Sequence, residues 1–183
     1  MGPKDRRQTL KDLHKGRRRA YEEVVLRNYK AVYRFMVYLT RDISLAEELT
    51  QETFTSAWAN IESFEARASI ATWLHRIAYR KFIDSTRCLQ RNAALIAGLK
   101  EGNNNPRRSS DPLQGLTADE HTRLLYEAMR SLKQDEYIAI LLHYIQGLSF
   151  RQVAKVLKLP VGTVKWQNSR ALEKLRQYLS GRV

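Results

Sequence analysis

The chain has 183 residues with 32 Lys and Arg against 19 Asp and Glu, a formal charge of +13, which indicates a polyanionic partner, either nucleic acid or an acidic membrane. It contains no apolar run near the roughly 20 residues of a membrane span and no signal-peptide core, so we expect a cytoplasmic protein without stable membrane insertion. The single cysteine, Cys88, excludes an internal disulfide, and four scattered histidines give no metal-ligand spacing, so we expect neither metal nor other cofactor.

The first segment, residues 1–20, is strongly basic. It carries eight Lys or Arg against two Asp up to Arg19 and has no apolar periodicity. This composition is typical of a flexible arm, either a solubilising tail or a non-specific DNA contact, although a fixed structural element is the alternative.

Residues 21–92 predict a small helical domain. Apolar side chains recur at spacings of three and four between Tyr21 and Leu39, which indicates one amphipathic helix. Ser44 and Glu47 have the spacing of a capping box and predict the start of a second helix. Ser69 predicts the N-cap of a third helix.

Residues 93–118 predict an interdomain linker, because Gly, Pro, Asn and Ser are frequent there. Its first residues, up to Leu99, could instead extend the preceding helix. Helical periodicity resumes in residues 119–183, with one helix at 124–132 and another from about Gln134. Gly147 is placed to end the latter as a C′ residue. No stretch alternates as a strand would, so the expected class is all-α with two small domains.

Residues 148–170 have the pattern of a helix-turn-helix. Ser149 and Gln152 form a capping-box pair, and Pro160 ends this short helix and permits the next one to begin. Four apolar residues are expected to hold the second helix on its domain: Val164, Ala171, Leu172 and Leu175. The polar and cationic arc is expected to face DNA: Lys165, Trp166, Ser169 and Arg170.

The second helix suggests specific contacts with bases. Arg170 could bind guanine O6 and N7, while Gln167 or Asn168 could read adenine. Trp166 either packs on the domain or leans on the sugar-phosphate backbone. The competing interpretation is an ordinary basic helical hairpin with a solvated face, but turn, caps and charge all favour DNA binding.

The first domain has two oppositely charged stretches. Residues 41–65 contain six acids and one Arg, whereas residues 76–91 contain five Lys or Arg and one acid. This asymmetry favours one surface for a basic protein and another for nucleic acid, although solvated faces would look the same. Aromatic residues interleaved with basic residues suit single-stranded DNA: Phe64, Arg67, Trp73, His75, Arg76, Tyr79, Arg80, Lys81 and Phe82. Trp73 taken alone, on an apolar face, is better explained as a core residue than as a DNA contact.

Four motifs resemble those of the extracytoplasmic-function (ECF) sigma factors. AEELTQETFTSAW (residues 46–58) resembles region 2.2, and SIATWLHRIA (69–78) with the following FID resembles regions 2.3 and 2.4. GLSFRQVA (147–154) and LPVGTVK (159–165) resemble region 4.2. The helix-turn-helix motif is shared with other regulators, but the two halves in this order are specific to the family.

The resemblance implies a bacterial promoter-specificity subunit that binds core RNA polymerase and promoter DNA and performs no chemistry. It implies that the clamp helices of the polymerase's largest subunit are bound by Glu48, Leu49, Gln51, Glu52 and Phe54. It implies that single-stranded −10 DNA is bound by Phe64, Arg67, Trp73, Arg76, Tyr79, Arg80 and Lys81, with one base flipped into the loop around residues 62–67. It implies that double-stranded −35 DNA is bound by Arg151, Thr163, Lys165, Trp166, Gln167, Ser169, Arg170 and Lys174. An anti-sigma factor that clamps the two domains is a further expected partner.

Two departures from the family pattern limit what can be transferred. Tyr79-Arg80 stands where the family often has Arg-Asn, and residues 166–169 replace a more common recognition sequence, so neither promoter element can be inferred. Two other classes of DNA-binding protein would need features that the sequence lacks. A stand-alone helix-turn-helix regulator would need a sensor domain, and a recombinase would need a nucleophile or a metal-binding carboxylate cluster.

Overall fold

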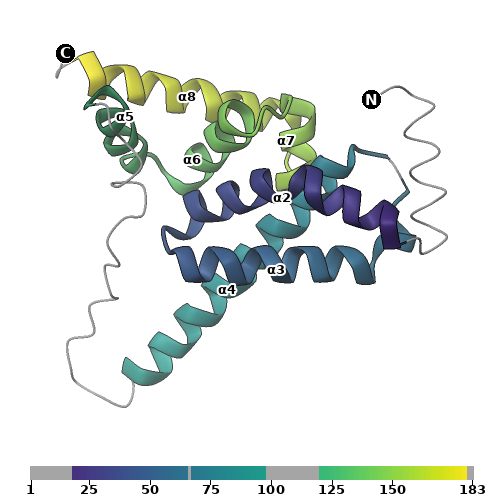
Figure 1. Cartoon of the computed structure of the whole chain (residues 1–183). Helices are drawn as coiled ribbons and strands as arrows, with labels where there is room; N and C mark the ends of the chain where they lie inside the picture. The colour runs from purple at the N-terminus through teal and green to yellow at the C-terminus, as the bar shows by residue number, and fades with distance from the viewer. Residues whose placement is uncertain (1–17, 66, 98–119, 181–183) are drawn as a thin grey trace.

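The computed structural model describes residues 18–65, 67–97 and 120–180, and all regular elements in these ranges are helical (Figure 1). This confirms the predicted class. No helix among these residues is long and apolar enough to span a membrane. The elements are α2 (Arg18–Thr40), α3 (Ile43–Ala59), the 3-10 turn η1 (Ile61–Ser63), α4 (Ile70–Ala97), α5 (Glu120–Arg130), α6 (Gln134–Ile140), the π-helical turn η2 (Leu141–Ile145), α7 (Phe150–Leu157) and α8 (Val161–Ser180).

The first domain consists of α2, α3 and α4 packed on one another. The predicted capping box at Ser44 is wrong, because α3 already begins at Ile43 and Asp42 is its N-cap. The Asp42 carboxylate accepts a hydrogen bond from the backbone N–H of Leu45 at 3.0 Å. The N-cap at Ser69 is confirmed, since the Thr72 N–H donates to its hydroxyl at 3.2 Å.

The boundaries of the basic arm and the linker differ from those expected. Helix α2 begins at Arg18, so the last three residues of the expected arm are helical, while residues 1–17 lie outside the described part. Helix α4 continues to Ala97, so residues 93–97 of the expected linker are also helical, and its remainder lies outside the described residues.

The second domain consists of α5 to α8, with α8 packed against α5, α6 and α7. Gly147 has φ +68° where the chain leaves η2, as expected of a C′ residue. Ser149 and Gln152 form the predicted capping box, and Lys158, with φ 56°, ends α7. The expectation that Leu172 is buried is wrong: it is 39% exposed, because the buried stripe of α8 continues from Val164 to Ala171 and Leu175.

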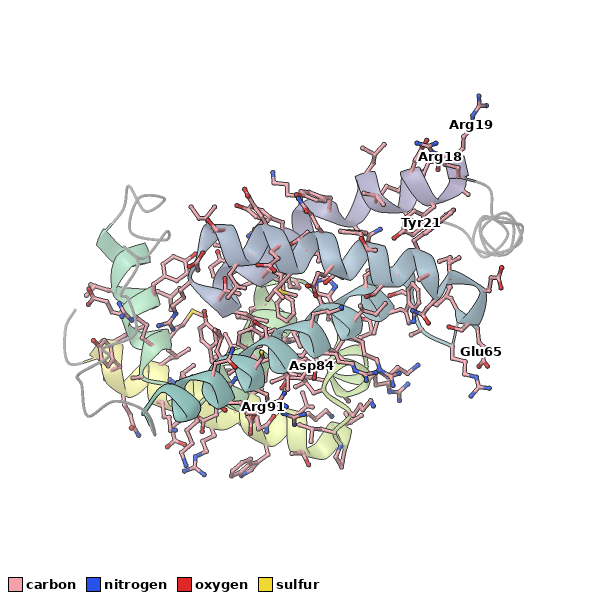
Figure 2. All side chains as sticks on the ribbon, turned by 90° about the horizontal axis from the view of Figure 1, so that it is seen from below. Arg18, Arg19, Tyr21, Glu65, Asp84 and Arg91 are labelled. Atoms are coloured by element: carbon pink, nitrogen blue, oxygen red, sulfur yellow. The ribbon has the colours of Figure 1, made fainter. Side chains whose placement is uncertain are left out.

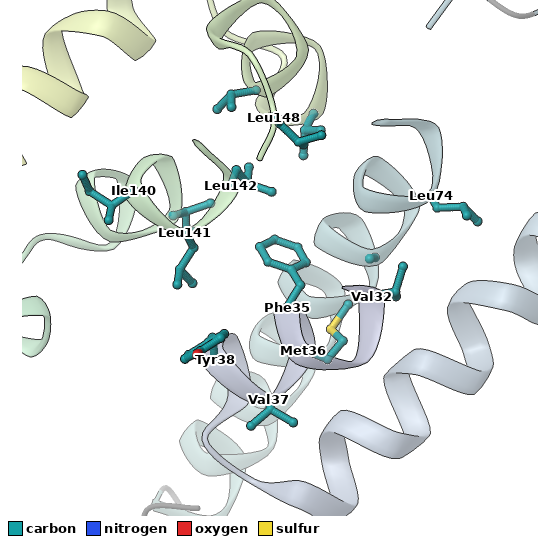
Figure 3. Packing of buried hydrophobic residues seen from close by; sticks show 14 of the residues in the cluster. Val32, Phe35, Met36, Val37, Tyr38, Leu74, Ile140, Leu141, Leu142 and Leu148 are labelled. Atoms are coloured by element: carbon teal, nitrogen blue, oxygen red, sulfur yellow. The ribbon is translucent and has the colours of Figure 1, made fainter. Parts of the chain in front are cut away.

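The two domains pack directly on each other, which we call the closed arrangement. Helix α4 lies against α7 and α2 lies against η2. Phe35 of α2 and Leu142 of η2, both fully buried, belong to one apolar cluster that includes residues of both domains (Figure 3). Burying side chains of this size contributes roughly 1.5–3 kcal/mol each, so apolar packing stabilises the contact between the domains.

Candidate functional site

An open hollow of about 490 Å³ lies between the end of α3 and one side of α4. Three cations of α4 line it, together with the indole of Trp73: Arg76, Arg80 and Lys81. Short polar side chains from α3 and η1 complete the wall: Ser56, Asn60 and Ser63. Figure 2 labels Glu65, in the loop after η1, and Asp84, the acid of α4 that lines the hollow.

The hollow combines an aromatic ring with cations, which is what a single-stranded nucleic acid requires for stacking and phosphate contact. The Trp73 ring packs on Phe64 with centroids 5.0 Å apart, and Phe64 is only 6% exposed. Phe64 therefore supports Trp73 from behind and does not itself offer a stacking face. The polar wall at Ser56, Asn60 and Ser63 was not expected, because small polar residues carry no distinctive sequence signal.

Tyr79 does not line this hollow. It is half-buried on the side of α4 that faces the second domain, where burial and the nearby charge of Asp135 raise the pKa of its phenol. Residues 76 and 80 face the hollow, whereas residue 79 lies about 100° away from residue 80 around the helix. A role for Tyr79 in −10 binding stays a prediction.

Helix α7 covers the other side of the loop before α4. The Lys155 ammonium donates to the backbone carbonyl of Arg67 at 2.6 Å, and the Gln152 amide reaches the Ser69 hydroxyl at 3.5 Å. A second cavity of about 290 Å³ lies here, lined by Arg67, Trp73, Lys155 of α7 and Lys158 at the end of α7. Of the residues expected to bind −10 DNA, Trp73 and Arg76 line both the hollow and this second cavity beside α7.

His75 lies at the centre of the domain contact. It is 2% exposed, packs against Phe35 in a tilted arrangement with centroids 5.3 Å apart, and contacts Ala71 O through Nδ1 at 2.8 Å. Burial lowers the pKa of His75 below its ordinary value, so the ring is neutral. The Nε2 atom lies 3.4 Å from Gln146 Oε1. A neutral ring that donates from Nδ1 has an acceptor at Nε2, so the opposite orientation of the Gln146 amide, with its NH₂ towards Nε2, suits this contact better.

The acidic face of α3 is exposed at Glu47, Glu48 and Gln51. Glu52 is also exposed, but it pairs with Lys81 of α4 at 3.1 Å. Leu49 and Phe54, both expected to contact polymerase, are 3% and 7% exposed. Both residues face the core of their own domain and lie beneath the charged surface, so a direct contact of either with polymerase stays a prediction.

The exposed face of α8 carries Lys165, Trp166, Ser169 and Arg170. The Trp166 ring is 58% exposed, so it does not pack into the domain. The guanidinium carbon of Arg170 lies over this ring, 5.1 Å from its centroid. Arg151 of α7 is exposed and Thr163 is partly buried. Five of the expected −35 residues therefore lie at the surface.

Gln167 and Asn168 lie on the opposite face, at 7% and 5% exposure. The spacing from Val164 to Ala171 places both positions on the buried stripe of α8, so a contact of either with adenine stays a prediction that their burial does not favour. Their side-chain oxygens have no hydrogen-bond partner among the described residues. The apolar periodicity already contained this signal, since positions 167 and 168 lie three and four residues after Val164.

Lys174 is also less available than expected. Its ammonium contacts both carboxylate oxygens of Glu136 in α6, at 2.9 and 2.7 Å. The Nε of Arg170 lies 3.3 Å from the same carboxylate. Sequence reasoning missed Glu136 because it lies 38 residues from Lys174.

Two family models match the chain. The model described as Sigma-70 region 2 matches residues 24–92, and the model described as Sigma-70, region 4 matches residues 122–175. Each match falls within one of the two domains.

Curated relatives are similar over nearly the whole chain. ECF RNA polymerase sigma factor SigC of Mycobacterium tuberculosis is 32% identical over 167 residues, 88% of this chain and 84% of the relative. ECF RNA polymerase sigma factor SigW of Bacillus subtilis is 28% identical over 176 residues, 93% and 94% of the two chains.

Two solved structures share the fold. One is sigma factor RpoE in complex with the anti-sigma factor NepR from Bartonella quintana, with TM-score 0.71, 24% identity, and coverage of 89% of this chain and 98% of that one. The other is CnrH in complex with the cytosolic domain of CnrY, with TM-score 0.72, 22% identity, and coverage of 97% and 98%. At these identities the likeness shows the fold alone.

Proposed function

The chain belongs to the ECF sigma factors of RNA polymerase, and we propose that its three surfaces divide the work of promoter-specific initiation. The face of α3 binds core polymerase, the hollow beside α4 binds the opened −10 strand, and α8 reads the −35 duplex. The observation that carries this division is the separation of an acidic face, on α3, from two basic faces, on α4 and α8.

The acidic face of α3 suits a basic surface of the polymerase, which the family resemblance places on the clamp helices of the largest subunit. Glu48 and Gln51 are free to contact it, whereas Glu52 must share its charge with Lys81. Leu49 and Phe54 shape the face from below. Contacts of this kind set partner choice and association rate.

The hollow suits an unstacked −10 strand. Trp73 offers a π-face to a base, and Arg76, Arg80 and Lys81 lie where phosphates would follow. The loop at residues 62–67 would receive a flipped base, and its backbone at Arg67 is occupied by Lys155 in the closed arrangement. Binding of −10 DNA on both sides of this loop therefore requires α7 to move away.

We further propose that the protein acts in the cytoplasm and catalyses no reaction itself, because its role is to position polymerase and DNA. A stand-alone regulator is set aside, since the region 2 model matches a whole domain that such a regulator does not need. An anti-sigma factor for this chain stays a prediction. The RpoE structure contains an anti-sigma factor, and the CnrH structure contains the cytosolic domain of CnrY.

The decisive experiment is binding of the full chain to core RNA polymerase, followed by transcription from promoters selected by the reconstituted complex. Glu48→Lys is expected to weaken core binding roughly tenfold or more, because a like charge would face the basic partner. Its affinity for free DNA is expected to stay the same or rise.

The matched control is Glu23→Lys, which makes the same charge change at an exposed residue of α2. Equal weakening by both variants would show that overall charge, and not the α3 face, governs docking. Absence of any core binding by the unchanged protein would overturn the proposed function.

A further inference from the structure

A buried carboxylate lies behind the exposed face of α8. The Glu136 side chain, in the first turn of α6, is 4% exposed. It accepts hydrogen bonds from the Lys174 ammonium at 2.7 and 2.9 Å and from the backbone N–H of Lys133 at 3.1 Å. Burial acts to raise the pKa of Glu136, but these hydrogen bonds and the charges of Lys174 and Arg170 outweigh it and lower the pKa. The carboxylate is therefore ionised at neutral pH.

Arg170 connects this carboxylate to the surface. Its Nε lies 3.3 Å from Glu136 Oε1, and its guanidinium carbon lies 5.1 Å from the centroid of the Trp166 ring. Residues 166, 170 and 174 are spaced by four, so they form one stripe along α8. The buried end of the stripe is neutralised by Glu136, while Trp166 and Arg170 remain 58% and 44% exposed at the other end.

The way in which Arg170 is held suits recognition of a base. The contact with Glu136 engages Nε, and bidentate binding of guanine requires the terminal nitrogens of a guanidinium in a fixed plane. A long side chain that is already held in one rotamer loses less entropy on binding than a free one. The cation–π contact with the Trp166 ring restricts the guanidinium from the second side.

We propose that Glu136 is a positioning residue for −35 recognition: it holds Arg170 against Trp166, so that guanidinium and indole meet the DNA as one preset unit. The proposal rests on the proposed function, in which α8 reads the −35 duplex. Glu136 does not touch DNA itself. It acts by restricting Arg170 and by neutralising one of the positive charges of α8, which limits binding to phosphates of any sequence.

The test uses full-length protein assembled with core polymerase, a −35 duplex selected by the unchanged complex, and the single-base variants of that duplex. Glu136→Gln keeps the size and the acceptor for the Lys133 N–H but removes the charge. Discrimination between selected and variant duplexes is expected to fall at least about fivefold. Affinity for unrelated DNA is expected to rise, with a steeper dependence on salt.

Asp135→Asn is the matched control, because it removes the same charge from the adjacent, exposed position of α6. It is expected to leave discrimination unchanged. A double variant, Glu136→Gln with Arg170→Ala, is expected to discriminate no worse than Arg170→Ala alone, since Glu136 acts through Arg170. Arg170→Lys, which retains the charge without the planar fork, is expected to lose discrimination while keeping the salt dependence.

The proposal is overturned if Glu136→Gln lowers binding to all sequences equally, or if the losses in the double variant add. It is also overturned if Glu136→Gln does not fold and Arg170→Lys retains full discrimination. A complex that initiates transcription but shows no −35 preference before any substitution would instead refute −35 recognition by α8, and this result is distinct from the others.

Discussion

Two tyrosine hydroxyl groups hold the domains in the closed arrangement, and their removal should shift the protein towards separated domains. The hydroxyl of Tyr126 in α5 lies 2.7 Å from that of Tyr38 in α2, and the Tyr137 hydroxyl donates to the Tyr38 carbonyl at 2.8 Å. The double change Tyr126→Phe and Tyr137→Phe deletes both contacts while it keeps the rings, which pack on the shared core.

The magnitude follows from the two hydrogen bonds. Each contributes a net 0.5–1.5 kcal/mol, so the closed arrangement should lose about 1–3 kcal/mol. The ratio of open to closed molecules should therefore rise about 5- to 150-fold. The substitutions remove no ring from the apolar cluster, so each domain should stay folded.

The assay is single-molecule energy transfer between the native thiol of Cys88, which is exposed on α4, and a cysteine introduced at the exposed position Glu173 on α8. Where the open state is too rare to count, the difference follows from the urea midpoints of the same signal. Tyr144→Phe is the control, because this tyrosine is 53% exposed. An unchanged open-to-closed ratio in the double variant would refute the reasoning.

Two further predictions concern the buried polar residues. Burial lowers the pKa of His75 from 6.5, so the stability that neutral His75 contributes is complete above pH 6.5. This contribution is lost as the pH falls from 6.5 towards the lowered pKa, at up to about 1.4 kcal/mol per pH unit. Urea unfolding from pH 8 to pH 5 should therefore show a steeper loss of stability in the unchanged protein than in His75→Gln, and equal slopes would contradict the prediction. Asn168→Leu should raise the free energy of unfolding by about 1–3 kcal/mol, because it removes a buried side-chain oxygen that has no hydrogen-bond partner among the described residues. It should leave the −35 preference unchanged, and a lost preference would mean that Asn168 contacts DNA.

Local sequence determined the class of the fold and most helix ends. Ser69, Gly147 and the Ser149–Gln152 pair were assigned correctly, because a cap or a positive φ depends on groups within about four residues. The assignment of Ser44 as an N-cap was wrong because a second capping residue lies equally close in the sequence. Asp42, two residues earlier, competed for the same helix terminus, and its carboxylate accepts the Leu45 N–H.

The DNA-binding and polymerase-binding residues could be predicted only in part. Cations and aromatic residues on α4 and α8 were recognised from their types, and Trp73, Arg76, Arg80 and Lys81 do share one hollow. Which face each residue occupies was less certain, because a resemblance transfers a motif without distinguishing surface from core. Four residues expected at binding surfaces are instead buried in their own domains: Leu49, Phe54, Gln167 and Asn168.

The sequence by itself determined two helical domains, their opposite charges and the family motifs, since each of these depends on residue types and short spacings. Only the tertiary structure decided which charges remain available. Glu52 shares its charge with Lys81, and Glu136 engages Arg170 and Lys174 from 34 and 38 residues away. The physical reason is that an ion pair forms wherever packing brings two side chains within about 4 Å, and packing, unlike helix formation, depends on residues far apart in the chain.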